Sequence, residues 1–248
     1  MSTTRVTPEA QRGDVSNRRL FLHWTPSGLV DSTHIPVEEM LKIEERHEAT
    51  RAESAPLGLF GFAIGTFLIA MVVSGFFPRT ALVAVIPTLL LFAGIGQFIA
   101  GLLTFDRGST FGGTMFCTFG AGYATAGMFA WMQQAGVITP SSDNRAIFGL
   151  GVLCFAYIAL VLTIAAMRSN MTYAATLGAL VIGYALASLP YFGGPAAIGH
   201  IGGWLMIVSS LIAFYGGGAV VVNSNWRREV WPLGAPPRYE LTPKVDVR

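Results

Sequence analysis

Side chains that could do chemistry are scarce in the centre of the chain, from Leu57 to Val222. Within its apolar runs there is no Asp, Glu, Lys or Arg, and His200 stands alone, where a single histidine is more often hydrogen-bonded in packing than part of a proton relay. What remains is a set of neutral hydroxyl and amide side chains, which can hydrogen-bond a small solute or anion without holding it tightly. The charged residues that separate the runs are Arg79, Asp106, Arg107, Asp143, Arg145 and Arg168.

Motifs for catalysis or cofactor binding are absent from the sequence. There is no P-loop, no G-x-G-x-x-G after a strand and no H-E-x-x-H. Cys117 and Cys154 fall in the middle of different apolar runs, where we expect neither a disulfide nor a metal site. The apolar runs contain no evident Ser–His or Asp–Asp pairing, so we do not expect an intramembrane hydrolase. We therefore expect no enzymatic activity, no cofactor and no metal.

The composition indicates a membrane protein. Hydrophobic residues make up 52% of the chain and charged residues 12%, about half the charged share usual for a soluble domain. A bilayer core about 30 Å thick needs about 20 apolar residues at 1.5 Å per residue, and continuously apolar runs favour helices over a β-barrel. We predict an all-α membrane protein with six transmembrane helices, at about 57–77, 81–104, 111–135, 146–167, 171–191 and 197–222.

Basic residues near the ends of these spans are divided unevenly between the two sides of the membrane. With six spans both termini share one side, which carries eight Lys or Arg residues against Arg79 and Arg145 on the other. Because Lys and Arg favour the cytoplasmic side, we expect both termini in the cytoplasm of a cytoplasmic-membrane protein. The net charge of +2 then reflects topology and membrane-lipid contact, and no nucleic-acid partner. The eight residues are Lys42, Arg46, Arg51, Arg107, Arg168, Arg227, Arg228 and Arg238.

The polar ends of the chain flank this membrane domain, which we place at residues 55–222. In the N-terminal tail, residues 1–54, we expect disorder over residues 1–30 and a short amphipathic helix over Val37–Arg51. That helix could lie on the membrane surface, on a neighbouring subunit or in solvent. Residues 1–30 lack an apolar h-region, so no signal peptide is expected, and residues 223–248 form a cytoplasmic tail.

Glycine and aromatic residues alternate in the first and third predicted spans, as in G-F-A-I-G-T-F and C-T-F-G-A-G-Y-A-T. Glycines at three- to four-residue spacing let membrane helices approach closely. The alternative is that they clear volume beside a narrow conduit, which the aromatic rings constrict. Pro56 is expected in the first turn of the first span, where its missing N–H costs nothing, whereas Pro87 should break the hydrogen-bond ladder of the second span.

Several motifs resemble, in order, segments of the YaaH-type acetate uptake transporter family. The signature N-P-A-P-L-G-L of that family is matched by Ala55, Pro56, Leu57, Gly58 and Leu59. Four further segments that resemble it are Q-F-I-A-G-L-L at Gln97–Leu103, G-S-T-F-G-G-T at Gly108–Thr114, F-G-A-G-Y with Thr125 at Phe119–Tyr123, and W-P-L-G at Trp231–Gly234. Together these motifs span roughly residues 55–234.

The resemblance implies a six-helix subunit that assembles into a hexamer with one pathway per subunit. It implies uptake of acetate and related short monocarboxylates, in some members succinate, with channel and proton-symport mechanisms both open. Carried over by position, the constriction of the family falls on Phe62, Phe119 and Leu180. The other residues expected along the pathway are Gly58, Gly65, Thr66, Gln97, Thr118, Gly120, Tyr123 and Tyr184.

The chain departs from the family pattern at three places. Glu53 and Ser54 replace the leading Asn-Pro, although both residues could still cap the first helix. Phe119 stands where Tyr is common, and Gly122 where the family has a wide aromatic residue, which leaves open a larger or more apolar monocarboxylate as substrate. Two other functions stay open: a non-transporting sensory or scaffold membrane protein, and an ammonia or urea channel, for which His200 lacks a second histidine.

Overall fold

The computed structural model describes residues 22–25, 28–31, 52–139 and 141–235, and divides the chain into two compact units, Met1–Ala52 and Glu53–Arg248. In the first unit, β1 (Leu22–Thr25) and β2 (Gly28–Asp31) form an antiparallel pair in which Trp24 lies opposite Leu29. The prediction of disorder over residues 1–30 did not anticipate these two segments, in which backbone pairing forms a ladder of four residues in each strand. The helix predicted at Val37–Arg51 lies outside the described residues.

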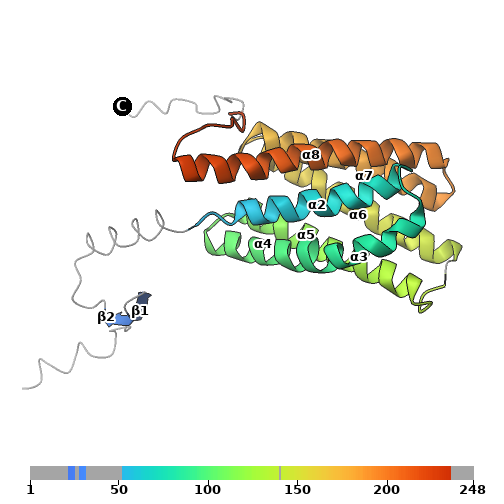
Figure 1. The fold of residues 1–248 in the computed structure, drawn as a ribbon, viewed down its shortest axis with the longest axis horizontal. Helices are drawn as coiled ribbons and strands as arrows, with labels where there is room; N and C mark the ends of the chain where they lie inside the picture. Colours follow the sequence, from blue (N-terminus) through green and yellow to red (C-terminus); the bar gives the residue numbers. More distant parts are fainter. Residues whose placement is uncertain (1–21, 26–27, 32–51, 140, 236–248) are drawn as a thin grey trace, which may run out of the picture. The chain divides into compact units, whose positions relative to one another are not determined.

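Within its described residues the second unit contains helices and no strands, and its helices run alongside one another as a bundle (Figure 1). Three continuous helices, α2, α5 and α7, begin at one end of the bundle, and the segments between and after them return to it. In chain order the elements are α2 (Ala55–Val73), η3 (Arg79–Ala81), α3 (Leu82–Leu90), η4 (Leu91–Gly96), α4 (Gln97–Asp106), α5 (Thr110–Gln134), α6 (Ser142–Ala166), α7 (Met171–Ser188), η5 (Leu189–Phe192) and α8 (Ala196–Trp226).

Five of these helical segments are long and apolar enough to cross a membrane. They are Ala55–Val73, Arg79–Asp106, Ser142–Ala166, Met171–Phe192 and Ala196–Trp226. The remaining helix, α5, has 25 residues and so a length of about 37 Å at 1.5 Å per residue, but its glycine, threonine and glutamine content lowers its apolar character. The predicted span at 111–135 thus exists as a helix of sufficient length inside the bundle.

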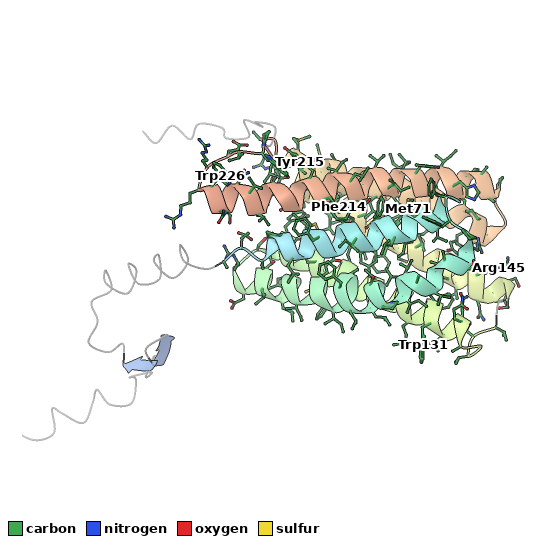
Figure 2. All side chains as sticks on the ribbon, in the orientation of Figure 1. Met71, Trp131, Arg145, Phe214, Tyr215 and Trp226 are labelled. Carbon is green, nitrogen blue, oxygen red and sulfur yellow. The ribbon has the colours of Figure 1, made fainter. Side chains whose placement is uncertain are left out.

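The outward faces of the bundle are apolar. Large hydrophobic side chains are exposed on every long helix, for example Leu91, Ile147, Tyr157 and Leu211, which suits contact with lipid tails rather than water. Exposed Trp226 and Trp131 lie toward opposite ends of the bundle (Figure 2), as expected for aromatic residues at the two membrane–water interfaces. The second unit is that of an integral membrane protein.

Polar side chains fix where α5, α6 and α7 begin. Ser109 accepts a hydrogen bond from the Gly112 amide at 3.1 Å, Ser141 caps α6 in the same way, and Asn170 accepts one from the Tyr173 amide at 2.9 Å. Each bond satisfies an amide that the helix itself leaves without a partner.

The segment that follows α8 supplies further caps for α7. The carbonyls of Gly234 and Leu233 accept from the amides of Met171 at 3.3 Å and Thr172 at 3.1 Å, and Leu233 also accepts from the Thr172 hydroxyl at 2.7 Å. The W-P-L-G segment is held in turn by stacking of Trp231 on Tyr215, with ring centroids 5.8 Å apart. The tag after the last span is therefore part of the bundle, where it closes the first turn of α7.

Two prolines behave differently. Pro56 lies in the first turn of α2, as predicted. Pro87 lies inside α3, which does not end there; the irregularity appears just after, where Leu91–Gly96 adopt a π-helix that connects α3 to α4. Local widening of this kind re-registers a helix whose regular ladder a proline has interrupted.

Candidate solute pathway

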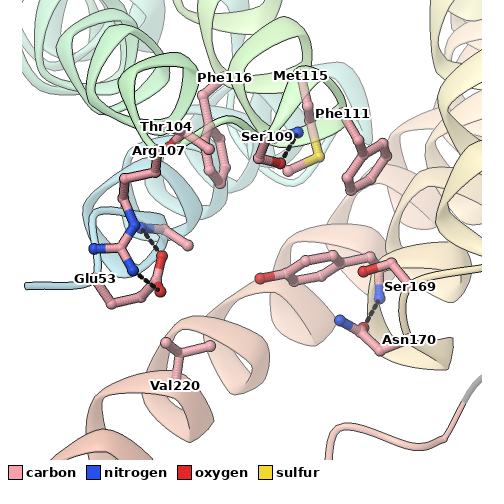
Figure 3. Close-up of a pocket in the computed structure, with 13 residues that line it drawn as sticks. Glu53, Thr104, Arg107, Ser109, Phe111, Met115, Phe116, Ser169, Asn170 and Val220 are labelled. Carbon is pink, nitrogen blue, oxygen red and sulfur yellow. Dashed lines mark hydrogen bonds and ion pairs between the residues drawn. The ribbon is translucent and has the colours of Figure 1, made fainter. Parts of the chain in front are cut away.

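An open cavity of about 350 Å³ lies at the end of the bundle where α2, α5 and α7 begin (Figure 3). We call it the vestibule. Glu53 and Arg107 are the charged side chains among its described lining, which is otherwise a mixture of polar groups and rings. The lining residues are Glu53, Ala55, Thr104, Arg107, Ser109, Phe111, Gly112, Met115, Phe116, Ser169, Asn170, Tyr173 and Val220.

An ion pair crosses one side of the vestibule. Nη2 of Arg107, just after α4, lies 3.2 Å from Oε2 of Glu53, just before α2. The two side chains point toward each other, with Ser169 and Asn170 on the far side of the cavity (Figure 3). The other carboxylate oxygen of Glu53 accepts from the Ala55 amide at 3.4 Å, so Glu53 contributes to capping α2.

Ser54 holds the start of α2 in a different way from the one expected. It occupies the N-cap position, but its hydroxyl makes no capping bond and lies 2.9 Å from the Thr104 hydroxyl instead. Thr104 donates its single proton to the Ala100 carbonyl at 2.7 Å, so Ser54 must be the donor to Thr104. Glu53 and Ser54 thus tie the start of α2 to the end of α4 by two side-chain contacts.

A second, smaller cavity continues inward from the vestibule. We call it the neck; its volume is about 10 Å³, close to the room that one water requires. It shares Met115, Phe116 and Tyr173 with the vestibule, and its lining also includes Phe62. The Thr176 hydroxyl belongs to its lining. This hydroxyl is buried and makes no hydrogen bond within the described part of the chain. The lining residues are Leu59, Phe62, Met115, Phe116, Tyr173, Thr176 and Leu177.

Side chains at matching positions of α2, α5 and α7 fall into three sets, which we call layers. Each helix contributes one residue to each layer, at the same spacing along all three helices. The first layer is Leu59, Phe116 and Leu177; the second is Phe62, Phe119 and Leu180; the third is Thr66, Tyr123 and Tyr184.

The first two layers are apolar and buried. All three residues of the first layer line the neck. In the second layer the rings of Phe62 and Phe119 meet edge to face, with centroids 5.4 Å apart and an angle of 71°, the geometry that aromatic quadrupoles favour. Leu180 is fully buried in the same hydrophobic cluster. The structure therefore brings Phe62 and Phe119 into contact and places Leu180 in their cluster.

The third layer is polar. The hydroxyls of Thr66 and Tyr123 are hydrogen-bonded to each other, and the Tyr184 side chain lies close to that of Tyr123. The Tyr123 ring also contacts Phe62 edge to face, with centroids 6.2 Å apart. A small network of hydroxyls thus lies directly behind the apolar layer.

A short sequence repeat underlies the second and third layers. Each helix carries a large apolar residue, then a glycine three positions later, then a hydroxyl residue: F-A-I-G-T, F-G-A-G-Y and L-V-I-G-Y, starting at Phe62, Phe119 and Leu180. This repeat gives Leu180 the same position on α7 that Phe62 has on α2 and Phe119 on α5.

The glycine of each repeat packs against the helix that follows its own. A Cβ added at Gly65 would lie 2.6 Å from the Ala93 Cβ, and one at Gly122 would lie 2.6 Å from the Phe155 ring. At Gly183 the nearest atom would be in Met206, at 2.9 Å. At these positions close helix approach, rather than clearance of a conduit, explains the glycine.

The other residues expected along the pathway have mixed positions. Gly58 leaves room for the Phe116 ring, 2.6 Å from where its Cβ would be, and so shapes the neck. Gly120 lies against the α4 backbone at Phe98, while Thr118 is half-buried and lines neither cavity. Gln97 is fully buried, and its amide nitrogen and oxygen have no hydrogen-bond partner among the described residues.

Sequence reasoning missed Phe116, Tyr173, Thr176 and the Glu53–Arg107 pair. A signal was present for the α7 residues, because Thr176 and Tyr173 precede Leu180 by one and two turns on the same helix face. His200, the lone histidine, packs against the turn at Gly75, where its ring would lie 3.1 Å from an added Cβ.

Comparison with known proteins gives one family and several relatives. The family model described as GPR1/FUN34/yaaH matches residues 39–233. The succinate-acetate/proton symporter SatP of Escherichia coli K12 is 27% identical over 183 residues, which are 74% of this chain and 95% of SatP. Ammonia transport outward protein 2 of Saccharomyces cerevisiae is 29% identical over 190 residues, covering 75% of this chain and 67% of the yeast protein.

A solved structure is also similar. The structure of the bacterial acetate channel SatP superposes with a TM-score of 0.70 at 27% identity, covering 75% of this chain and all of that one. The similarity to SatP extends over sequence and fold together.

Proposed function

The chain belongs to the GPR1/FUN34/yaaH family, and from this premise we propose that it carries acetate and related short monocarboxylates across the cytoplasmic membrane. The path we propose runs from the vestibule through the neck, past Phe62, Phe119 and Leu180, to the hydroxyls of the third layer. The names of the SatP relatives support the substrate class.

The observation that carries the proposal is the order of environments along α2, α5 and α7. A polar vestibule leads to a water-sized neck, then to an apolar layer, then to a hydroxyl network. Three helices contribute one residue each to every layer, as in a conduit lined from three sides. A bundle held only by packing has no need for this succession.

The chemistry of a weak acid fits such a path. Acetic acid ionises near the pKa of a glutamic acid side chain, about 4.3, so much of it is neutral at acidic external pH. An apolar layer strongly disfavours a bare charge but can pass a small acid that has shed its water. The hydroxyls of Thr66, Tyr123 and Tyr184 then replace the lost water contacts.

The same proposal includes the topology and assembly of the protein. With α5 as a sixth span, both termini and the vestibule lie on the cytoplasmic side, because that side holds most of the Lys and Arg residues near the span ends. Apolar outward faces on several helices supply the surfaces for assembly of a homohexamer in which each subunit has its own path.

A second candidate function is the passage of ammonia. It is favoured by the name of the yeast relative, Ammonia transport outward protein 2. A neutral hydroxyl-lined path is compatible with ammonia as well as with acetic acid, so the substrate must be tested directly.

The test is flux into liposomes that contain the purified full chain. Labelled acetate, propionate, lactate, succinate and ammonium are compared with and without a pH gradient. We expect uptake of acetate above that of protein-free vesicles, with stimulation by an inward proton gradient if transport is proton-linked. Flux of ammonium alone would favour the second candidate, and no flux of any solute would favour a sensory or scaffold protein.

A further inference from the structure

We propose that Arg107 is a binding site for the carboxylate of the solute in the vestibule, and that Glu53 occupies this site as a tethered carboxylate when no solute is bound. The class of ligand rests on the proposed function, while the site itself rests on the geometry of the vestibule.

The position of Arg107 is suited to capture. Its side chain lines a cavity of about 350 Å³, which has ample room for a small organic acid. Phe116 and Tyr173, which separate the vestibule from the neck, belong to the same lining. An anion held at Arg107 would therefore wait at the mouth of the proposed path.

One partner of Arg107 has the same chemistry as the proposed solute. The planar guanidinium group presents N–H donors in a fork that matches a carboxylate. In this chain the matching group, 3.2 Å away, is the carboxylate of Glu53. The carboxylate of Glu53 is thus tethered beside the guanidinium group, where it competes with a dissolved carboxylate.

The Glu53–Arg107 contact is exchangeable. The side chains of Arg107 and Glu53 are 25% and 38% exposed, and an ion pair open to water contributes little to stability. A dissolved carboxylate can therefore compete with Glu53 for the guanidinium group. The start of α2 stays attached when Glu53 leaves, because the Ser54–Thr104 hydrogen bond holds it to α4 independently.

The direct test measures acetate binding to the purified full chain in detergent. Binding is monitored by the line broadening of labelled acetate in NMR spectra. Glu53→Gln removes the competitor, so we expect the Kd for acetate to fall several-fold. Arg107→Gln removes the site, so we expect Kd to rise several-fold, with partial recovery in Arg107→Lys, which keeps the charge but loses the fork. An unchanged Kd in Glu53→Gln, or wild-type binding by Arg107→Gln, would overturn the proposal.

Two controls complete the test. Glu229→Gln removes an exposed carboxylate that lines neither cavity and should leave Kd unchanged; an equal fall in Kd there would mean that only the net charge matters. If Arg107→Gln does not fold, Glu53→Gln with Arg107→Gln removes both charges together. We expect this double variant to bind acetate more weakly than Glu53→Gln alone, and equal binding would overturn the proposal.

Flux measured on the same variants separates this inference from the proposed function. If the wild type transports acetate but neither substitution changes the Kd, the Arg107 site is contradicted and the transport proposal is not. No acetate flux in the wild type, with the expected shifts in Kd, contradicts the transport proposal and supports the Arg107 site.

Discussion

The vestibule and the layers behind it are built from opposite kinds of contact. In the vestibule, a partly exposed ion pair between Glu53 and Arg107 and several helix caps line an open cavity. Behind it, Phe62, Phe119 and Leu180 are at most 3% exposed and pack as a closed cluster. One region can exchange partners with dissolved solutes, and the other can change only if packed side chains move.

The difference suggests a division of labour along the proposed path. Electrostatic contacts in water are weak and exchangeable, so the vestibule is suited to collecting an anion. Dry, close-packed contacts are sensitive to single methylene groups, so the layers are suited to deciding what passes. Substitutions in the layers should therefore change rate and size selectivity, while substitutions in the vestibule should change apparent affinity.

The largest expected effect comes from filling the second layer. Leu180→Trp adds a large ring to the second layer, in which Phe62, Phe119 and Leu180 are all buried. We therefore expect acetate flux in liposomes to fall to the protein-free background. Ile182→Trp is the matched control, because Ile182 lies on α7 and is 53% exposed. Equal flux in the two variants, both shown to be folded by size-exclusion chromatography, would break the distinction between the regions.

A smaller effect is expected when the helix contact behind the layers is crowded. Gly65→Ala adds a Cβ 2.6 Å from that of Ala93, and overpacking of this kind costs about 1–3 kcal/mol. We expect a lower thermal unfolding midpoint in detergent. At Gly151 on α6 an added Cβ meets nothing within 4 Å, so Gly151→Ala should leave the midpoint unchanged or raise it. A similar loss at both positions would argue against close approach as the reason for Gly65.

The hydroxyl layer should respond more in rate than in stability. Thr66→Val removes the hydrogen bond to Tyr123, worth about 0.5–1.5 kcal/mol, and takes away one of the groups proposed to replace water. We expect a several-fold fall in acetate flux with a small change in the unfolding midpoint. Thr125→Val is the comparison, since the Thr125 hydroxyl donates to the Ala121 carbonyl in its own helix. Wild-type flux in Thr66→Val would remove the third layer from the proposed path.

The smallest effect is expected at the segment that closes the first turn of α7. Tyr215→Phe removes a hydrogen bond of 2.7 Å to the Pro232 carbonyl on the exposed side of the bundle, at a cost of about 0.5–1 kcal/mol. We expect a slightly lower unfolding midpoint and unchanged acetate flux. A clear loss of flux would show that this segment acts on the vestibule through Met171 and Thr172 in the first turn of α7, and would contradict the contrast between the two regions.

The helices could be predicted from the sequence because their signals are local. Long apolar runs and polar breaks predicted the bundle, and the motifs around Phe62 and Phe119 predicted a pair that the structure brings into contact. The first span was predicted to end at residue 77, but α2 ends at Val73, because a turn at Gly75 with φ 79° follows the helix. The short β1–β2 pair was missed because a polar tail composition conceals a ladder of four residues in each strand.

The parts that escaped prediction depend on contacts between distant segments. Glu53 and Arg107 are 54 positions apart, and nothing local indicates that the start of α2 meets the end of α4. The spacing of Gly58, Gly61 and Gly65 predicted a helix face of small residues. Only the fold shows that Ala93 packs against this face at Gly65. Tyr173 and Thr176 line cavities that exist only once three helices have packed together.

The central claim is that solute passes between α2, α5 and α7 through the second layer, and Phe62→Ala tests it most directly. Labelled acetate and the longer acid butyrate are measured in liposomes for the wild type, Phe62→Ala and Phe67→Ala, the last being a control because Phe67 packs on Phe214 instead, with ring centroids 6.3 Å apart. We expect Phe62→Ala alone to raise acetate flux several-fold and to admit butyrate, because a large side chain leaves the narrowest layer. Identical flux in all three proteins would contradict the assignment of this layer to the path.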